Sequence, residues 1–387
     1  MLHRAAVRTR WRMDFDYVVM PVVIVVLALI VDGLGLRYAF AVSRRPLRRG
    51  QKAIRLVGAW AAMMLASSVA TLSAYNAIAM HAFWVKHPPA GEFEAVNGAR
   101  MYIHCMGEGS PALVLDSGLG DDSMMWAQLQ PVLSKTTRVC AYDRAGFGGS
   151  EPTAGPQDAD QIVEALHGLL GAASISGPVV LMGHSIAGIY IRDYAVKYPE
   201  DVAGLIFVDA STPFQDRKMG VTMGGGPPPW LLQFAMIVGV PRLIGMCSSH
   251  GSGENTDYPV MKSEDRCRMY YPALAMELRA FGDSSGEASR RSSFGSLPVL
   301  IFSHDPFGTL PRKPQSADEK KRQGMWDGLQ ENLKSLSTRS RRIIVTGGTH
   351  HLFEERPQLV VDEVTAFLEQ IRGTAPQPTT YGSTTRE

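Results

Sequence analysis

One short segment of the chain contains a serine that could act as a nucleophile. Residues 179–188 read VVLMGHSIAG: an apolar run typical of a strand passes directly into a glycine, a histidine and Ser185, and small residues then allow a helix to begin. The pattern predicts a strand, a tight turn and a helix, with Ser185 at the apex of the turn. A serine hydroxyl is a poor nucleophile unless it is held exposed beside a base, and a sharp turn at a strand end provides that exposure. A buried serine in a glycine-rich turn is the competing interpretation.

Other short apolar segments indicate further strands around this turn. Residues 112–116 and 138–142 run into the glycine-rich turns of ALVLDSGLG and RVCAYDRAGFGGS. Three more runs follow Ser185, namely GLIFVD at 204–209, PVLIF at 298–302 and RIIVT at 342–346. Because strands that alternate with helical stretches form mainly parallel sheets covered on both faces, the expected fold class is α/β.

With these segments in place, the chain resembles the α/β-hydrolase superfamily over about residues 90–372. The resemblance is carried by the motifs DSGLG, YDRAGFGGS and GHSIAG, by a histidine seven residues before Pro357, and by the chain order serine, acid, histidine. It implies the α/β-hydrolase fold, a mainly parallel eight-stranded sheet with helices on both faces and a helical lid. The hydrolase core is expected in residues 90–210 and 297–372, and the lid insertion in residues 211–296.

The resemblance also implies the roles of a Ser-His-Asp triad. Ser185 is the expected nucleophile, and His350 is the expected base, which takes the serine proton and later gives it to the leaving group. Family members place this histidine after a small residue and seven positions before a proline, which favours His350 over the adjacent His351. His184, directly before the nucleophile, is interpreted as a packing or polar residue beneath the turn.

Two aspartates remain open as the acid that orients His350. Asp209 ends the predicted sixth strand and Asp305 follows the seventh, and the superfamily uses either place. In the usual pattern after the seventh strand the acid stands three residues beyond a glycine. Here Ser303 replaces the glycine and Asp305 comes one residue early, which favours Asp209. Asp143, in YDRAGFGGS, sits at a turn that family members use structurally and ranks third.

Backbone amides are expected to stabilise the oxyanion that forms when Ser185 attacks. One is the amide of Ile186, where the start of a helix adds partial positive charge. The resemblance assigns the second to Leu119, which follows Ser117 and Gly118 at the place where relatives commonly read His-Gly. This chemistry needs no cofactor, and the sequence offers no cluster of residues that would form a metal site.

The N-terminal segment, residues 1–86, differs in kind and is expected to be a membrane anchor. Residues 18–36 are apolar apart from Asp32, and residues 56–80 are apolar or small throughout. Each stretch approaches the roughly 20 residues that a membrane helix needs, so two transmembrane helices are predicted, at about 17–38 and 56–80. A signal peptide is the alternative interpretation of the first stretch, although no clear small-residue cleavage site follows it.

Charge and cysteine content predict on which side of the membrane the large domain lies. Residues 43–55 carry six basic side chains, and this predicts a cytoplasmic loop with the catalytic domain outside; four arginines before the first span favour the opposite.

In the strand order usual for this fold, Cys105 and Cys140 lie on neighbouring strands, and Cys247 and Cys267 both lie between the sixth and seventh strands. Two disulfides would fit an oxidising compartment, and four buried thiols in a cytoplasmic protein are the alternative.

The remaining features narrow the partners of the protein. A formal net charge of +2 over 387 residues gives no indication of nucleic-acid binding. Within the lid, residues 231–244 form an apolar, helix-like run that is expected to pack onto the body or to line an apolar pocket. Residues 373–387 are rich in Thr, Pro and Gly and are expected to be a disordered tail.

Together these patterns predict a multi-pass membrane protein that cleaves an ester through an acyl-enzyme, in the manner of a carboxylesterase or lipase. Its substrate is expected to be a small, apolar molecule, and its other partner is the lipid bilayer. An aminopeptidase or other amide hydrolase, a cofactor-free peroxidase-like enzyme and a noncatalytic binding protein are the alternatives, because fold alone does not decide function.

Overall fold

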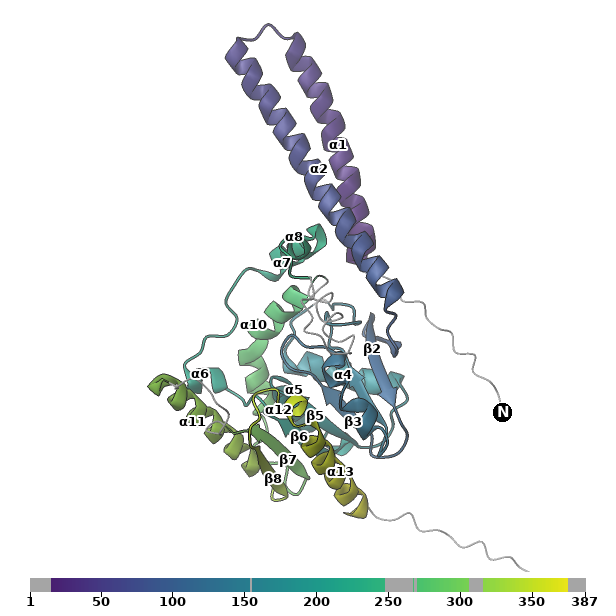
Figure 1. The fold of residues 1–387 in the computed structure, drawn as a ribbon, viewed down its shortest axis with the longest axis vertical. Coiled ribbons are helices and arrows are strands. Elements are labelled where there is room, and N and C mark those ends of the chain that lie inside the picture. The colour runs from purple at the N-terminus through teal and green to yellow at the C-terminus, as the bar shows by residue number, and fades with distance from the viewer. Residues whose placement is uncertain (1–14, 154, 248–266, 268–269, 306–315, 375–387) are drawn as a thin grey trace, which may run out of the picture.

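The structure is a computed structural model that describes residues 15–153, 155–247, 267, 270–305 and 316–374. Figure 1 shows a long helical hairpin that projects from an α/β body. The strands of the body are β1 (Glu92–Val96), β2 (Ala99–Met106), β3 (Leu113–Asp116), β4 (Val139–Tyr142), β5 (Val179–His184), β6 (Val202–Val208), β7 (Val299–His304) and β8 (Ser340–Val345). Its helices outside the lid are η1 (Ser123–Trp126), α3 (Gln130–Leu133), α4 (Ala159–Ala172), α5 (Ala187–Lys197), η2 (Pro199–Asp201), α11 (Ala317–Asn332), η3 (Leu333–Leu336), α12 (Leu352–Glu355) and α13 (Pro357–Thr374).

The strands form one sheet in the order β1-β2-β4-β3-β5-β6-β7-β8, which confirms the predicted eight-stranded, mainly parallel sheet. β2 pairs antiparallel with both β1 and β4, and the other neighbouring strands are parallel. The carboxyl ends of parallel strands meet at one edge of a sheet, where α/β proteins usually bind ligands. Ser185, Asp209 and Asp305 follow β5, β6 and β7 directly, so all three lie at this edge.

Alternate residues of the central strands enter two separate cores. On β5, Leu181 packs into the core that contains residues of α4, α5 and α10, whereas Val180 and Met182 pack into the core that contains residues of α3 and α13. All three side chains are fully buried. This alternation follows from the two-residue period of a strand, and the helices cover both faces of the sheet as predicted.

Between β6 and β7 lies the segment predicted as the lid, residues 211–296, and we keep the name lid for it. Its described helices are α6 (Gln215–Met219), α7 (Pro229–Val238), α8 (Val240–Leu243) and α10 (Tyr270–Ala288). The apolar run 231–244 does not form one helix, because Gly239 has a φ of +85° between α7 and α8. Glycine adopts this left-handed conformation without steric cost, and it ends α7 there. α10 packs against α7 as well as against α4 and α5, so it joins the lid to the body.

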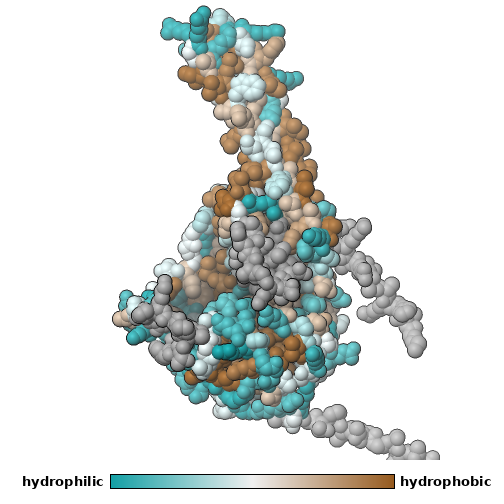
Figure 2. Space-filling model, in the orientation of Figure 1, coloured by the Kyte–Doolittle hydropathy of each residue, from teal (hydrophilic) through white to brown (hydrophobic). Residues whose placement is uncertain are grey.

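The hairpin consists of α1 (Phe15–Arg44) and α2 (Arg49–Lys86), which pack along each other. Both helices extend beyond the predicted spans, and α2 begins inside the basic segment 43–55. Figure 2 shows apolar side chains along the hairpin and hydrophilic ones at its tip. Both helices are long and apolar enough to cross a membrane, a test that a signal sequence near the N-terminus also passes.

The two ends of the chain fall partly outside the described residues. Residues 1–14 of the predicted anchor and residues 375–387 of the predicted tail lie outside them. α13 continues through Thr374, so the first two residues of the predicted tail are helical.

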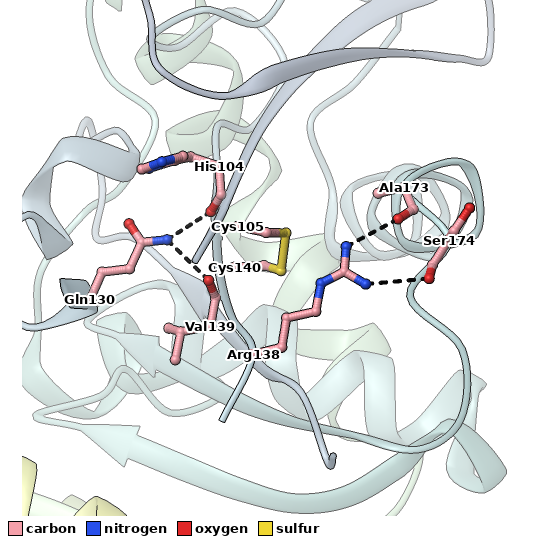
Figure 3. The surroundings of a disulfide bond; sticks show 8 residues. All are labelled: His104, Cys105, Gln130, Arg138, Val139, Cys140, Ala173 and Ser174. Atoms are coloured by element: carbon pink, nitrogen blue, oxygen red, sulfur yellow. Dashed lines mark hydrogen bonds between the residues drawn. A yellow bond between two sulfur atoms is a disulfide. The ribbon is translucent and has the colours of Figure 1, made fainter. Parts of the chain in front are cut away.

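All four cysteines form disulfides. Cys105 and Cys140 stand directly opposite each other on the antiparallel strands β2 and β4, and the bond between them links these strands at one side of the sheet (Figure 3). Nearby, the Gln130 side chain donates hydrogen bonds to the carbonyls of His104 and Val139, which join α3 to both strands. The second disulfide, Cys247–Cys267, links two positions within the lid.

Candidate active site

Ser185 occupies a strained turn between β5 and α5. Its φ is +54°, in the left-handed region that non-glycine residues rarely adopt, at a typical cost of about 1–3 kcal/mol. The turn is tight: a Cβ at Gly183 would lie 2.9 Å from the backbone of Ala187, and one at Gly188 would lie 2.5 Å from the Cβ of Ala210. Glycine is therefore required on both sides of Ser185, and the turn presents the serine hydroxyl at the carboxyl edge of the sheet.

A chain of hydrogen bonds connects Ser185 to a buried carboxylate through His350. The Ser185 Oγ lies 3.0 Å from Nε2 of His350, and Nδ1 of the same ring lies 2.6 Å from Oδ2 of Asp209. An ionised carboxylate only accepts hydrogen bonds, so Nδ1 carries the hydrogen and Nε2 is left to accept the serine proton. Asp209 is fully buried and His350 is partly exposed, which suits a base that must meet both serine and substrate.

The carboxylate of Asp209 is held by more groups than the sequence indicated. Nδ1 of His304 lies 2.9 Å from both of its oxygens, and the indole Nε1–H of Trp326 donates to Oδ1 over 3.0 Å. Burial alone would raise the pKa of Asp209, but the hydrogen bonds from His304 and His350 hold it well below its usual range. Asp209 is therefore ionised throughout the working range of a hydrolase. Its own φ of +43° places the side chain at this meeting point.

Asp305, the alternative acid, is one residue beyond His304. The Nδ1 atom of His350 carries a single hydrogen, and the short bond to Asp209 takes it. The Asp305 backbone amide donates to the Val345 carbonyl and continues the pairing of β7 with β8. In this geometry the Nδ1–H of His350 is directed to Asp209.

Three other residues singled out in the sequence, His184, Asp143 and His351, lie outside the hydrogen-bonded series from Ser185 to Asp209. The His184 ring is buried, and its Nε2 donates to the carbonyl oxygen of His350 over 2.9 Å, which ties the serine turn to the histidine loop. Burial and the neighbouring His350 lower the pKa of His184 to about 3, so its ring is neutral. Asp143 accepts hydrogen bonds from the amides of Ser123 and Gly149 and is a structural residue of its turn. His351 is partly exposed.

The loop that carries Leu119 is fixed by a buried arginine, Arg144. The guanidinium donates to the carbonyls of Ser117 (2.6 Å) and Gly118 (2.8 Å). Because C=O and N–H point in opposite directions in a trans peptide, the bond to the Gly118 carbonyl turns the Leu119 amide away from Arg144. Leu119 and Ile186 line the same cavity as Ser185, so both proposed oxyanion donors belong to residues of that cavity.

Arg144 also links this loop to the lid. Its Nη1 lies 2.7 Å from Asp116 and its Nε lies 2.6 Å from Glu277 of α10, and all three side chains are buried. Burial would lower the pKa of Arg144, but the two carboxylates raise it above its usual value, so the guanidinium stays charged. One cation thus connects the end of β3, the Leu119 loop and the lid helix α10.

The cavity at Ser185 has a volume of about 520 Å³. Its apolar lining comes mainly from the lid and includes Met219, Met223, Leu278 and Phe281. Three polar residues of α11, Glu319, Arg322 and Gln323, also line the cavity. Among the residues that the structure describes, no three His, Cys, Asp or Glu side chains are grouped in a way that would hold a metal ion. The cavity therefore offers a nucleophile, a base and apolar surface for a substrate of modest size.

The family model described as "Alpha/beta hydrolase family" matches residues 113–363. An AB hydrolase superfamily protein of Gibberella zeae is 28% identical over 294 residues, which are 68% of this chain and 87% of that protein. The uncharacterized protein YqjL of Bacillus subtilis is 24% identical over 260 residues, 66% of this chain and 83% of YqjL. A probable transporter of Hormonema carpetanum, efuK, is 34% identical over 117 residues, and the chain spans only 17% of its length.

Solved structures with the same fold have lower identity. The epoxide hydrolase CorEH superposes with a TM-score of 0.55 at 18% identity, over 73% of this chain and 99% of that one. The haloalkane dehalogenase DbeA-M1 variant from Bradyrhizobium elkanii gives 0.54 at 17% identity, over 73% and 97%. The enol-lactonase from Burkholderia xenovorans LB400 gives 0.51 at 20% identity, over 72% and 100%. At these identities the likeness concerns the fold alone.

Proposed function

Since the chain belongs to the alpha/beta hydrolase family, we propose that it is a membrane-anchored serine hydrolase that cleaves an ester bond of a small, apolar substrate. The observation that carries this proposal is the hydrogen-bonded series Ser185, His350 and Asp209, with Ser185 at a strained turn that opens into a cavity.

In the proposed reaction, His350 takes the proton of the Ser185 hydroxyl as its oxygen attacks the carbonyl carbon of the ester. The amides of Leu119 and Ile186 stabilise the oxyanion that forms. His350 then gives the proton to the departing alcohol, and an acyl-enzyme on Ser185 remains. Water, activated by His350, hydrolyses the acyl-enzyme and restores the serine, while Asp209 stabilises the transient imidazolium in both halves of the reaction.

A serine nucleophile favours an ester substrate over an epoxide or a haloalkane, after which two of the structural neighbours are named. Attack of a serine on an epoxide or a haloalkane would give an alkyl ether, which a histidine-activated water does not cleave. Attack on an ester gives an acyl-serine, which water does cleave. Among the neighbours cited, the enol-lactonase is the one whose name indicates an ester substrate. The apolar lid side of the cavity supports an apolar acyl group.

Anchoring in a membrane, with the body outside the cytoplasm, is part of the proposal. Two long apolar helices support the anchoring. The basic tip of the hairpin, which includes Arg45 and Arg48, supports a cytoplasmic position of the tip. Two disulfides in the body support an oxidising surrounding for it.

A covalent probe tests the proposal directly. An organophosphonate should label Ser185 of the full-length protein and block hydrolysis of p-nitrophenyl esters. Ser185→Ala should lose both labelling and hydrolysis. Ser211→Ala is the matched control, because Ser211 lines the same cavity but bonds to Gln215, and this variant should still be labelled. Labelling of a serine other than Ser185, or hydrolysis that persists in Ser185→Ala, would contradict the mechanism.

Substrate class is tested with the same protein. The rate should rise from acetate to medium-chain acyl esters, because longer chains cover more of the apolar lining. A faster rate on p-nitroanilides with a free amino terminus than on any ester would identify an aminopeptidase instead.

A further inference from the structure

The lid has an apolar face that no other described part of the protein covers. Trp230 and Phe234 of α7 are 69% and 51% exposed, and Leu243 and Ile244 at the end of α8 are 63% and 64% exposed. These large apolar side chains come from one short segment. A cluster of this kind on a protein surface marks a site that contacts another apolar phase or molecule. We call residues 229–244 the α7–α8 segment.

The C-terminal end of α7 and Arg242 of α8 are fixed to the hairpin. Asn76 donates from Nδ2 to the carbonyl of Met236 and accepts at Oδ1 from Arg242, over 3.0 and 2.8 Å. Ser73 donates to the carbonyl of Ile237 over 3.0 Å. Both α2 side chains are buried, and α7 also contacts α1. The lid is thus bonded to an anchor helix at a definite height, beside the part of α2 nearest the body (Figure 1).

That height lies inside the apolar part of the hairpin, near its body end. The stretch of α2 without Lys, Arg, His, Asp or Glu begins after Arg55 and ends at Met80, before His81. At about 1.5 Å per residue, Ser73 and Asn76 lie roughly 6–10 Å from its body end. An amphipathic helix that lies flat in a membrane interface buries its apolar face by about 5–10 Å, which is the same depth.

At this height, the hairpin and the α7–α8 segment both expose large apolar side chains. On the hairpin, Val22 of α1 is 60% exposed, and Tyr75 and Ile78 of α2 are 60% and 69% exposed. The face of α7 and α8 described above adds Trp230, Phe234, Leu243 and Ile244 beside them. A membrane that surrounds the hairpin therefore reaches the α7–α8 segment as well.

We propose that the α7–α8 segment lies in the interface of the bilayer that holds the hairpin, with Trp230, Phe234, Leu243 and Ile244 in contact with lipid. The inference rests on the membrane anchoring given under the proposed function, and it adds a second contact with the bilayer, through the lid. α10 packs against α7 and supplies Leu278 and Phe281 to the cavity, so the lid's membrane contact adjoins the wall of the active site. The substrate class that fits this position is an ester that partitions into the bilayer.

Quenching of tryptophan fluorescence by brominated phosphatidylcholine tests the contact. The full-length protein, Trp230→Phe and Trp326→Phe are each reconstituted in liposomes with and without bromine on the acyl chains. The emission lost in Trp230→Phe is the contribution of Trp230, and most of it should be quenched by bromine. The contribution of Trp326, which bonds to Asp209 in the body, should be unchanged and serves as the matched control.

The outcomes distinguish the membrane contact of the lid from the membrane anchoring of the hairpin. Flotation with liposomes together with an unquenched Trp230 contribution would overturn the lid contact and leave the hairpin anchor standing. Failure of the protein to float would overturn the anchor and the lid contact together.

Leu243→Glu should lower hydrolysis of a long-chain ester held in liposomes and leave hydrolysis of soluble p-nitrophenyl acetate unchanged. Ile344→Glu, at a 51% exposed position on β8, should change neither, and equal losses in both glutamate variants would contradict the inference.

Discussion

Replacement of Asp209 by asparagine should lower kcat about ten-thousandfold while the protein remains folded. The carboxylate receives the Nδ1–H of His350 at 2.6 Å from within a fully buried site. Asparagine has nearly the same shape, but its amide group can hold the ring in the wrong tautomer and carries no charge to stabilise the imidazolium. A ten-thousandfold loss corresponds to about 5.5 kcal/mol of transition-state stabilisation, the size found when a triad aspartate is replaced in this way.

The structure supports a loss of this full size. Asp209 also accepts from His304 and from Trp326, so several donors lose an ionised acceptor together. When the carboxylate is replaced, these buried donors are left without a good acceptor. This disturbs the position of the His350 ring and removes the charge that stabilises its cation. The substrate should still bind, so KM should change much less than kcat.

The assay is steady-state ester hydrolysis, with the melting temperature and circular dichroism as checks on folding. Asp305→Asn is the matched control, and it should cost less than about tenfold, because the Nδ1–H of His350 is already given to Asp209. A small loss for Asp209→Asn together with a large loss for Asp305→Asn would refute the assignment of the acid.

Four further outcomes are expected. His350→Ala should lower turnover by several orders of magnitude and His351→Ala should change it little, and equal losses in single-turnover assays would contradict the choice of base. His304→Gln should move the acidic limb of the kcat/KM profile to higher pH, because a weaker donor to Asp209 leaves more negative charge facing the His350 cation; an unmoved limb would reduce His304 to a packing role. Asp193 is buried, and its burial raises the pKa to about 7, so the folded state keeps a proton that the unfolded state has released between about pH 4 and 7. Stability from this group is therefore lost as the pH rises through that window, and Asp193→Asn should raise the melting temperature at pH 8 but not at pH 4, whereas an equal effect at both values would contradict the shift. Reducing agent should lower the melting temperature, and a C-terminal reporter that is active only outside the cytoplasm should be active; a silent reporter would reverse the orientation.

The parts that the sequence predicts well depend on neighbours in the chain. The strand, turn and helix around Ser185 are recognisable because strand residues, small residues and the serine follow one another without a gap. The sheet is predictable for the same reason. Each of its central strands contains a short apolar run, such as VVLM in β5 or LIFV in β6, and such runs suit strands that are buried on both faces.

The contacts around Asp209 could not be predicted in the same way, because they join distant segments. His304 is visible in the sequence only as a polar residue at the end of an apolar run, which is a weak signal at the active edge of a sheet. Trp326 comes from α11, 117 residues after Asp209, and no periodicity in its helix indicates that the indole faces the acid. Both were missed for this reason.

The lid shows the same limit. The helix α10 contains Gly282 and Gly286, which disfavour a helix by about 1 kcal/mol each relative to alanine, so its sequence gave little indication of it. Its ion pair with Arg144 and its packing on α4, α5 and α7 hold it in place. Residues 231–244 were expected to pack onto the body or to line an apolar pocket. α7 packs against α10, and it also packs on α2 through Ser73 and Asn76, about 160 residues away in the sequence.

The buried arginine at the base of the lid limits how this protein could diverge or be redesigned. A new substrate range is commonly sought by exchange of the lid for one from another protein. Here such a graft would remove Glu277 and leave Arg144 with one carboxylate fewer in a site without access to water. Loss of one partner of a buried ion pair typically costs about 3–5 kcal/mol, and in this chain the same guanidinium sets the backbone at Leu119. A transplanted lid is therefore expected to be compatible only if it brings an acidic residue to the place of Glu277.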